Sequence, residues 1–98
     1  MNRAHKIKLV KLSYLPDAIG QLVPTETYTE PFAIIRDVTR TESERPVEGL
    51  RPSKVFILLM TEYEGEDIIQ YEGETYTVYR TYLRDDARIE LYTGVRIG

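Results

Sequence analysis

The fold is decided by the C-terminal third of the chain, which reads Tyr71-Glu72-Gly73-Glu74-Thr75-Tyr76-Thr77-Val78-Tyr79-Arg80-Thr81-Tyr82-Leu83-Arg84-Asp85-Asp86-Ala87-Arg88-Ile89-Glu90-Leu91-Tyr92. β-branched and aromatic residues dominate positions 75–82, and such side chains suit a pleated, half-buried strand. Glycine and aspartate interrupt the pattern at Gly73 and at Asp85-Asp86, where the chain can adopt turn angles. The stretch therefore predicts a β-meander: a strand end, a tight turn, a long strand, a second turn and a last strand.

The remaining strands are predicted from apolar alternation and its interruptions. His5 to Leu12 alternates in part, and the proline, aspartate and glycine of Leu15 to Gly20 predict a turn or loop after it. Thr25 to Val38 reads as a strand that is at an edge or bulged at Pro31. Lys54 to Tyr63 is apolar on both faces, which predicts a central strand. With a short strand near residue 70, we expect a mainly β fold: a small, largely antiparallel barrel of about six strands.

A polar segment, residues 39–52, separates two apolar strands. Thr41 followed by Glu44 forms a capping-box pattern, so a short α-helix is predicted to begin at Thr41 or Ser43. Pro46 is tolerated only within the first turn, and the glycine and proline at 49 and 52 would end the helix. A loop with one helical turn is the alternative. We expect one β-barrel domain over residues 1–98, with this segment as an insertion.

Size and composition indicate one small soluble domain. The chain has 98 residues, of which 42% are hydrophobic and 30% charged, enough for one core and typical of a globular protein. The longest apolar run, Val55 to Met60, is far shorter than the ~18 residues of a membrane-spanning helix. Lys8 and Lys11 interrupt any signal-peptide core near the N-terminus. We therefore expect a protein made in the cytoplasm, with no membrane partner.

Little in the sequence points to catalysis. The chain has no cysteine and one histidine, His5, near the terminus; we predict no catalytic residues, no metal site, no cofactor and no enzyme activity. The acidic residues at 62–67 and at 85–86 lie beside glycine or in turns, where solvent screens them, so solvated loops are expected. The net charge of −3 argues against a general nucleic-acid binder.

Eight tyrosines and no tryptophan are a softer signal. Strand alternation places Tyr76 and Tyr82 on one face and Tyr79 on the other. Such rings can stack on bases, as in oligonucleotide-binding barrels. Packing within the barrel or at a subunit interface is favoured instead, because basic residues do not accompany the rings densely enough to bind phosphates.

The order of these patterns resembles the head-tail joining proteins of long-tailed bacteriophages, also called head-closure or stopper proteins. The resemblance lies in four stretches: Ala33 to Glu42, Gly49-Leu50-Arg51-Pro52 before an apolar strand, Tyr71 to Tyr82, and Ile89 to Tyr92. Residues Ser43 to Pro46 depart from it, because the family would have a helical segment with a glutamate and two aromatic residues there. The length of the predicted helix depends on this segment.

The resemblance implies a virion protein that forms a homo-oligomeric ring of about six or twelve copies in the head-tail connector. It would bind the connector adaptor protein above and the tail or a tail-terminator protein below. Loops projecting into the channel would help to retain packaged DNA, through weak contact. The alternatives are a tail-terminator or other tail-ring protein and, more distantly, a barrel of the oligonucleotide-binding type that binds single-stranded nucleic acid.

Two loop regions, 17–25 and 39–52, are predicted to carry the contacts, because polar, Pro/Gly-bearing loops on a rigid frame are where binding residues concentrate. The candidates for the interface or the channel loop are Asp17, Ile19, Gln21, Thr41, Glu42, Glu44, Arg45, Val47, Leu50 and Arg51.

Overall fold

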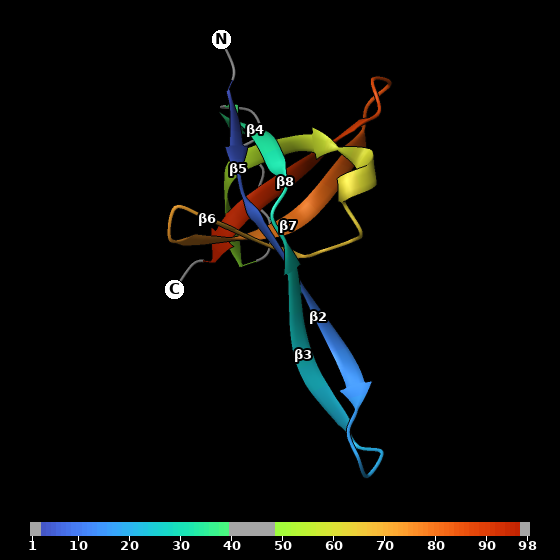
Figure 1. The fold of residues 1–98 in the computed structure, drawn as a ribbon. Coiled ribbons are helices and arrows are strands. Elements are labelled where there is room, and N and C mark those ends of the chain that lie inside the picture. Colours follow the sequence, from blue (N-terminus) through green and yellow to red (C-terminus); the bar gives the residue numbers. More distant parts are fainter. Residues whose placement is uncertain (1–2, 40–48, 97–98) are drawn as a thin grey trace.

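A computed structural model describes residues 3–39 and 49–96. This part of the chain forms eight strands and one 3-10 turn (Figure 1). The strands are β1 (Ala4–Lys6), β2 (Lys8–Pro16), β3 (Leu22–Thr29), β4 (Phe32–Asp37), β5 (Leu50–Leu59), β6 (Ile68–Tyr71), β7 (Glu74–Leu83) and β8 (Arg88–Arg96), and the turn is η1 (Met60–Glu62).

The strands form one antiparallel sheet in the order β1-β4-β5-β8-β7-β6-β2-β3. β1 and β2 are separated only by Ile7, yet β1 pairs with β4 and β2 pairs with β6, at opposite ends of the middle five strands. The sheet must therefore curl around itself into a half-barrel. Ile7 is 2% exposed, and its N–H donates to the Pro31 carbonyl oxygen at 3.0 Å, which ties down the bend between β1 and β2.

The core fills the inside of the curl and is centred on Phe56. The ring of Phe56 lies edge-on to Tyr76 at 5.4 Å and to Tyr71 at 6.2 Å between centroids, an arrangement that aromatic pairs prefer. The core cluster comprises Ile7, Leu9, Ala33, Phe56, Leu58, Ile69, Tyr76, Ile89 and Leu91. A second cluster, Val55, Ile57 and Tyr92, covers the other face of β5. We expected both faces of this apolar strand to be buried, and this is confirmed for Val55 to Leu58.

The mainly β, antiparallel architecture agrees with the sequence, but eight strands replace the expected six or so. The expected first strand is divided at Ile7, and it reaches back to Ala4 and on to Pro16. The expected strand from Thr25 to Val38 is two strands, β3 and β4, because the chain leaves the ladder at the buried Pro31. Since proline has no N–H to donate, the break falls there.

The predicted helical insertion is only partly within the described residues. Positions 40–48, which contain the predicted helix start, lie outside them. The end of the segment is strand rather than loop, because Leu50, Arg51 and Pro52 open β5 and pair with β8. In residues 3–39 and 49–96 the helical structure consists of the three-residue η1.

A β-bulge in β7 changes the faces of the tyrosines. The register with β8 shifts between Val78 and Arg80, so one extra residue is inserted there. Tyr76 consequently points into the core, whereas Tyr82 lies opposite Glu90 on the outer face and is 55% exposed. The prediction that Tyr76 and Tyr82 share a face is wrong, since a bulge reverses the alternation beyond it.

Candidate interaction surface

A two-stranded arm projects from the half-barrel. β6 pairs with β2 only at residues Lys8 to Val10, and beyond that point β2 pairs only with β3. Figure 1 shows these two strands leaving the barrel together as a long hairpin. We call residues 11–28 the arm. It accounts for the elongated shape of the molecule, which measures 50 × 32 × 25 Å.

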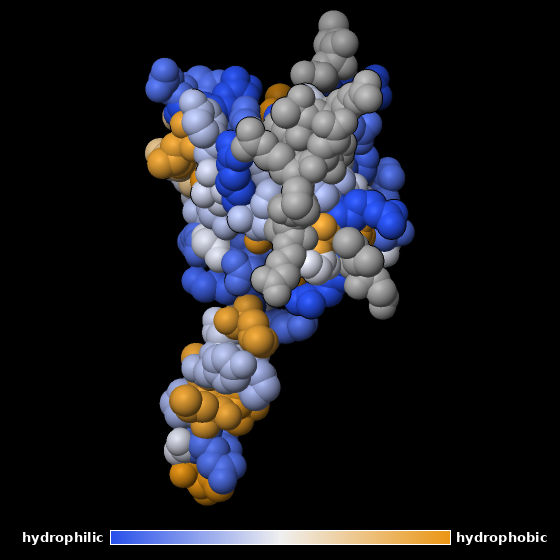
Figure 2. All heavy atoms as spheres, turned by 180° about the vertical axis from the view of Figure 1, so that it is seen from behind, coloured by the Kyte–Doolittle hydropathy of each residue, from blue (hydrophilic) through white to orange (hydrophobic). Residues whose placement is uncertain are grey.

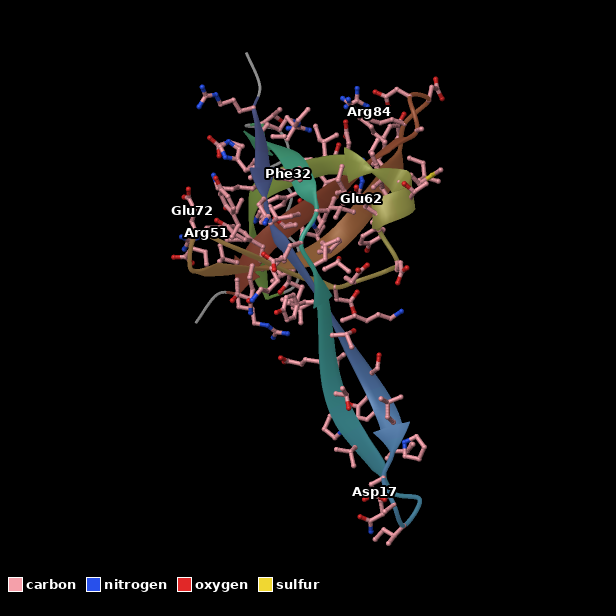
Figure 3. The ribbon with its side chains drawn as sticks, viewed as in Figure 1. Asp17, Phe32, Arg51, Glu62, Glu72 and Arg84 are labelled. Carbon is pink, nitrogen blue, oxygen red and sulfur yellow. The ribbon has the colours of Figure 1, made fainter. Side chains whose placement is uncertain are left out.

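The tip of the arm is a tight, internally bonded turn (Figure 3). The Oδ1 atom of Asp17 accepts hydrogen bonds from the backbone N–H groups of Ile19 and Gln21, both at 2.9 Å. The N–H of Asp17 donates to the Gln21 carbonyl at 2.8 Å, and Gly20 supplies the left-handed residue with φ of 86°. The turn predicted here is confirmed. It is shorter than expected, because Leu15 and Pro16 belong to β2.

The arm carries most of the exposed apolar side chains. Twelve large hydrophobic residues are exposed in the described part of the chain, and seven of them lie on the arm: Leu12, Tyr14, Leu15, Ile19, Leu22, Val23 and Tyr28. Ile19, at the tip, is the most exposed at 78%. Figure 2 shows apolar side chains repeating along the projecting arm. Contiguous apolar surface of this kind marks an interaction site in soluble proteins.

The two faces of the arm differ in chemistry. Residues directly opposite in an antiparallel pair lie on the same face. One face, which we call the apolar face, is formed by the pairs Leu12 with Glu26, Tyr14 with Pro24, and Pro16 with Leu22. The other is mixed, with Leu15 opposite Val23, Ser13 opposite Thr25, and Lys11 opposite Thr27. The apolar face is on the side of β2 opposite the buried Leu9, so it points away from the core.

Both edges of the arm are poor templates for adding a strand. Backbone groups in antiparallel strands alternate between pointing inward and outward, and the inward hydrogen bond from Asp17 to Gln21 fixes this alternation. It places the backbone nitrogens of Pro16 and Pro24 on the outer edges, where proline offers no N–H. Proline at such positions hinders edge-to-edge pairing. Each edge thus lacks one donor that strand addition would use, which favours contacts through side chains.

A second exposed apolar group lies at one end of the barrel, where β5 and β7 meet the start of β8. It consists of Leu59, Met60, Tyr82 and Leu83, which are 42 to 62% exposed. Leu59 lies opposite Arg88, Leu83 lies opposite Ile89, and the N–H of Met60 donates to the Ala87 carbonyl at 3.0 Å. We call this surface the barrel end.

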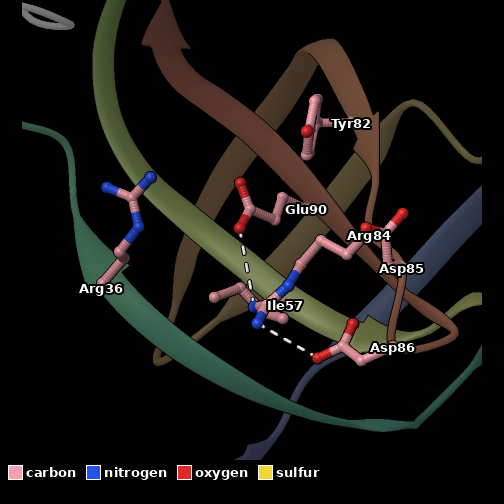
Figure 4. A pocket seen from close by; sticks show the side chains of 7 residues that line it. All are labelled: Arg36, Ile57, Tyr82, Arg84, Asp85, Asp86 and Glu90. Atoms are coloured by element: carbon pink, nitrogen blue, oxygen red, sulfur yellow. Dashed lines mark ion pairs between the residues drawn. The ribbon is translucent and has the colours of Figure 1, made fainter.

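Charged residues border the barrel end in a shallow hollow (Figure 4). Arg84 reaches across it, with one guanidinium nitrogen 3.1 Å from Asp86 and the other 3.6 Å from Glu90. Figure 3 shows Arg84 at the end of the molecule remote from Asp17. The arm tip and the barrel end therefore lie on opposite parts of one molecule.

The candidate residues from the sequence separate into three groups. Asp17, Ile19 and Gln21 come together at the arm tip. Leu50 is buried and pairs with Arg96, whereas Arg51 is exposed and pairs with Val95, so neither is in a loop as predicted. Thr41, Glu42, Glu44, Arg45 and Val47 lie outside the described residues. Sequence reasoning missed the apolar face, although a signal existed: between residues 12 and 25 the only charged residue is Asp17.

The acidic loop after η1 is partly buried rather than solvated. Glu66 is 3% exposed, and its Oε1 accepts from the N–H of Glu64 at 2.6 Å. The Tyr63 hydroxyl donates to the Glu66 carbonyl at 2.9 Å, and burial raises the pKa of this tyrosine. The expectation of a solvated loop is wrong for Glu66, which braces the turn.

Residues 3–39 and 49–96 contain no group of three or more His, Asp or Glu side chains placed to hold a metal ion. The same ranges contain no helix of the length and apolar character needed to cross a bilayer.

Comparison with known proteins shows that this fold is similar to that of a solved virion component. No protein-family model matches the chain, and no curated protein matches it in sequence. Among solved structures, a chain in the virion of a native gene transfer agent particle is similar, with a TM-score of 0.57 and 11% sequence identity. The match covers 97% of this chain and 96% of that one, so the two share their fold over nearly the whole length.

Proposed function

We propose that this chain is a structural component of a phage-type virion and acts in the head-tail connector as a head-closure or stopper protein. The observation that carries the proposal is the fold shared over 97% of the chain with a component of a gene transfer agent virion. The resemblance of the sequence to stopper proteins favours the connector over other positions in the particle. The role is one of binding and needs no catalysis.

The structure suggests how such a component would work. The half-barrel is a rigid frame with a continuous core, and the arm extends contacts well beyond it. In a ring of copies, the frame would contact the adaptor above and the tail below. The net charge of −3 suits weak contact with DNA in the channel, since strong binding requires cations at the phosphates.

Imaging tests the proposal directly. A small tag at the C-terminus would be located in assembled particles, in tailless heads and in free tails. We expect it at the head-tail junction and on DNA-filled heads. Detection only at the end of tail tubes would contradict the proposal and support a tail-terminator role.

Genetic deletion provides a second test. Removing residues 44–48, in the predicted loop, should leave a folded domain, checked by circular dichroism, but yield heads that do not join tails. Infectious particles at normal yield would contradict this.

The single-stranded nucleic-acid alternative is disfavoured because Tyr76 is buried and the bulge separates it from Tyr82, so these rings form no stacking platform.

A further inference from the structure

The arm presents an apolar surface that the monomer does not cover. We infer that the arm of one copy docks its apolar face on the barrel end of a second copy, in a head-to-tail contact. The inference deepens the proposed function, because it assigns the subunit contact of the ring and rests on that function for its role in the particle.

The exposed area of the arm is that of a protein interface. Its seven large hydrophobic side chains are 42 to 78% exposed. The strand register places Leu15 and Val23 on the mixed face, so the apolar face and the tip expose five of the seven, Leu12, Tyr14, Ile19, Leu22 and Tyr28. At about 100 Å² each, these five amount to roughly 500 Å², a large part of the ~800 Å² per partner of a standard interface. The area lies in the upper part of the about 300–600 Å² range of the largest apolar patch on a typical monomer, and such patches are often functional.

The same chain supplies a surface of matching chemistry. The barrel end exposes Leu59, Met60, Tyr82 and Leu83. The arm tip and the barrel end lie on opposite parts of the molecule (Figure 3), so one copy cannot bring them together. Two different, complementary surfaces on one chain produce a head-to-tail contact, which generates a ring when the rotation closes.

The charges on the two surfaces are compatible with this contact. The segment that would be buried, residues 12–25, contains one charged side chain, Asp17, whose carboxylate already accepts two backbone hydrogen bonds. At the root of the arm are Lys8 and Lys11, with Glu26 and Asp67 in the same hollow as Lys11. The barrel end carries Glu62, Asp85, Asp86 and Glu90 together with Arg84 and Arg88. Acidic side chains outnumber basic ones at the barrel end, so the lysines at the root of the arm are compatible with the rim of a head-to-tail contact.

The form of the arm also favours docking by side chains. Pro16 and Pro24 each remove one outward-pointing donor from an edge of the arm, so contact through side chains is favoured over strand addition. A two-stranded hairpin alone is marginally stable in water, and a second subunit packed on its apolar face would stabilise it. The bonded turn at Asp17 holds Ile19 in place for insertion.

Cross-linking tests the contact. Because the chain has no native cysteine, only the introduced cysteines can form disulfides. Ile19→Cys and Met60→Cys would be made as separate full-length variants and mixed under mild oxidation. We expect a mixed disulfide dimer at least tenfold in excess of that from the matched control pair, Ile19→Cys with Gln70→Cys, whose exposed β6 position is not on the barrel end. Equal yields from the two pairs, or Ile19→Cys dimers alone, would overturn the inference.

Sedimentation gives an independent measurement. The variant Leu12→Ser, Tyr14→Ser, Leu22→Ser should lose concentration-dependent self-association while keeping the circular dichroism of the folded barrel. The control Ser13→Ala, Thr25→Ala on the mixed face should associate as the unmodified protein does. Self-association that persists in the triple variant, or an unmodified protein that stays monomeric but binds anionic lipid vesicles, would overturn the inference.

The two proposals can fail separately. Cross-linking the Ile19→Cys and Met60→Cys pair within assembled particles shows whether copies contact each other by the arm, wherever the ring lies. A cross-link between copies in a particle whose tag is not at the junction would refute the connector role alone. A tag at the junction with the arm cross-linked to a different protein would refute the subunit contact alone.

Discussion

Replacing Gly94 with alanine is expected to destabilise the barrel through a collision of backbones. Gly94 is buried in β8, where it lies between Pro52 of β5 and Thr77 of β7. A Cβ atom at this position would lie 2.7 Å from the carbonyl oxygen of Arg51 and 3.2 Å from the Cβ of Leu50. The first distance is about 0.7 Å shorter than the 3.4 Å at which ordinary contact begins. Because the oxygen belongs to the main chain, no side-chain rotation can relieve the overlap.

The magnitude follows from the cost of overpacking. Inserting a methyl group into well-packed structure costs about 1–3 kcal/mol, because neighbouring atoms must shift. Alanine also restricts the unfolded chain, which offsets ~0.4–1 kcal/mol of this. The net loss should be about 1.5 kcal/mol, or roughly 6–12 °C in the melting temperature of a domain of this size.

Urea denaturation followed by circular dichroism measures the effect. The midpoint for Gly94→Ala should fall by about 1 M with an unchanged slope. Thr61→Ala, at an exposed position in η1, is the control and should change stability by less than about 0.5 kcal/mol. If Gly94→Ala is as stable as the control, β5 and β8 are not in close contact there, and the register between them is refuted.

Three further substitutions probe the core, the arm tip and the acidic loop. Phe56→Ala should lower the free energy of unfolding, measured by urea denaturation, by about 3–5 kcal/mol, because it removes the ring at the centre of the core. Phe56→Leu should lower it much less. A small loss in both variants would contradict the core assignment. Asp17→Ala should speed hydrogen exchange of the two amides bonded to the carboxylate and leave the melting temperature of the barrel within about 2 °C, since the arm lies outside the core; a large fall in melting temperature would refute the independence of the arm. Tyr63→Phe should lower stability near neutral pH by about 1 kcal/mol through loss of the hydrogen bond to Glu66. Because the pKa of Tyr63 is raised in the folded state, the contribution of this group to stability is complete below the ordinary pKa of 10.0 and is lost as the pH rises above it. The stability of the unmodified protein should therefore fall more steeply above pH 10 than the stability of Tyr63→Phe. Equal slopes for the two proteins would refute the burial argument.

The C-terminal meander could be predicted because its signals are local. Glu72 and Gly73 both have positive φ, 50° and 79°, as the tightest hairpin turns require. The strands on either side alternate with a period of two, apart from one position. That position, the bulge between Val78 and Arg80, reverses the faces of all residues beyond it. Nothing in the local composition marks it, because an inserted residue is defined by the partner strand.

The half-barrel closure could not be predicted for a related reason. The sequence predicts one strand from His5 to Leu12, whereas the structure has two, Ala4–Lys6 and Lys8–Pro16. What divides them is the choice of partner, since β1 pairs with β4 and β2 with β6. That choice depends on contacts between segments more than 25 residues apart, and local alternation carries no information about them.

The arm illustrates the limit of composition as a guide to burial. The lack of charge between Leu12 and Thr25 would ordinarily indicate core. The core, however, is already filled by Phe56 and its neighbours, and the arm extends past the last strand that could cover it.

The prolines of this chain have different roles in the barrel and in the arm. Pro31 is buried, and the N–H of Ile7 donates to its carbonyl, so this proline ends one strand and starts the next within the barrel. Pro16 and Pro24 occur where their missing N–H groups face outward along the arm. An exposed apolar hairpin with open edges would aggregate by indefinite strand pairing. Because each edge of the arm lacks one outward donor, strand pairing along the arm is weakened, and association through the side chains of the apolar face is favoured.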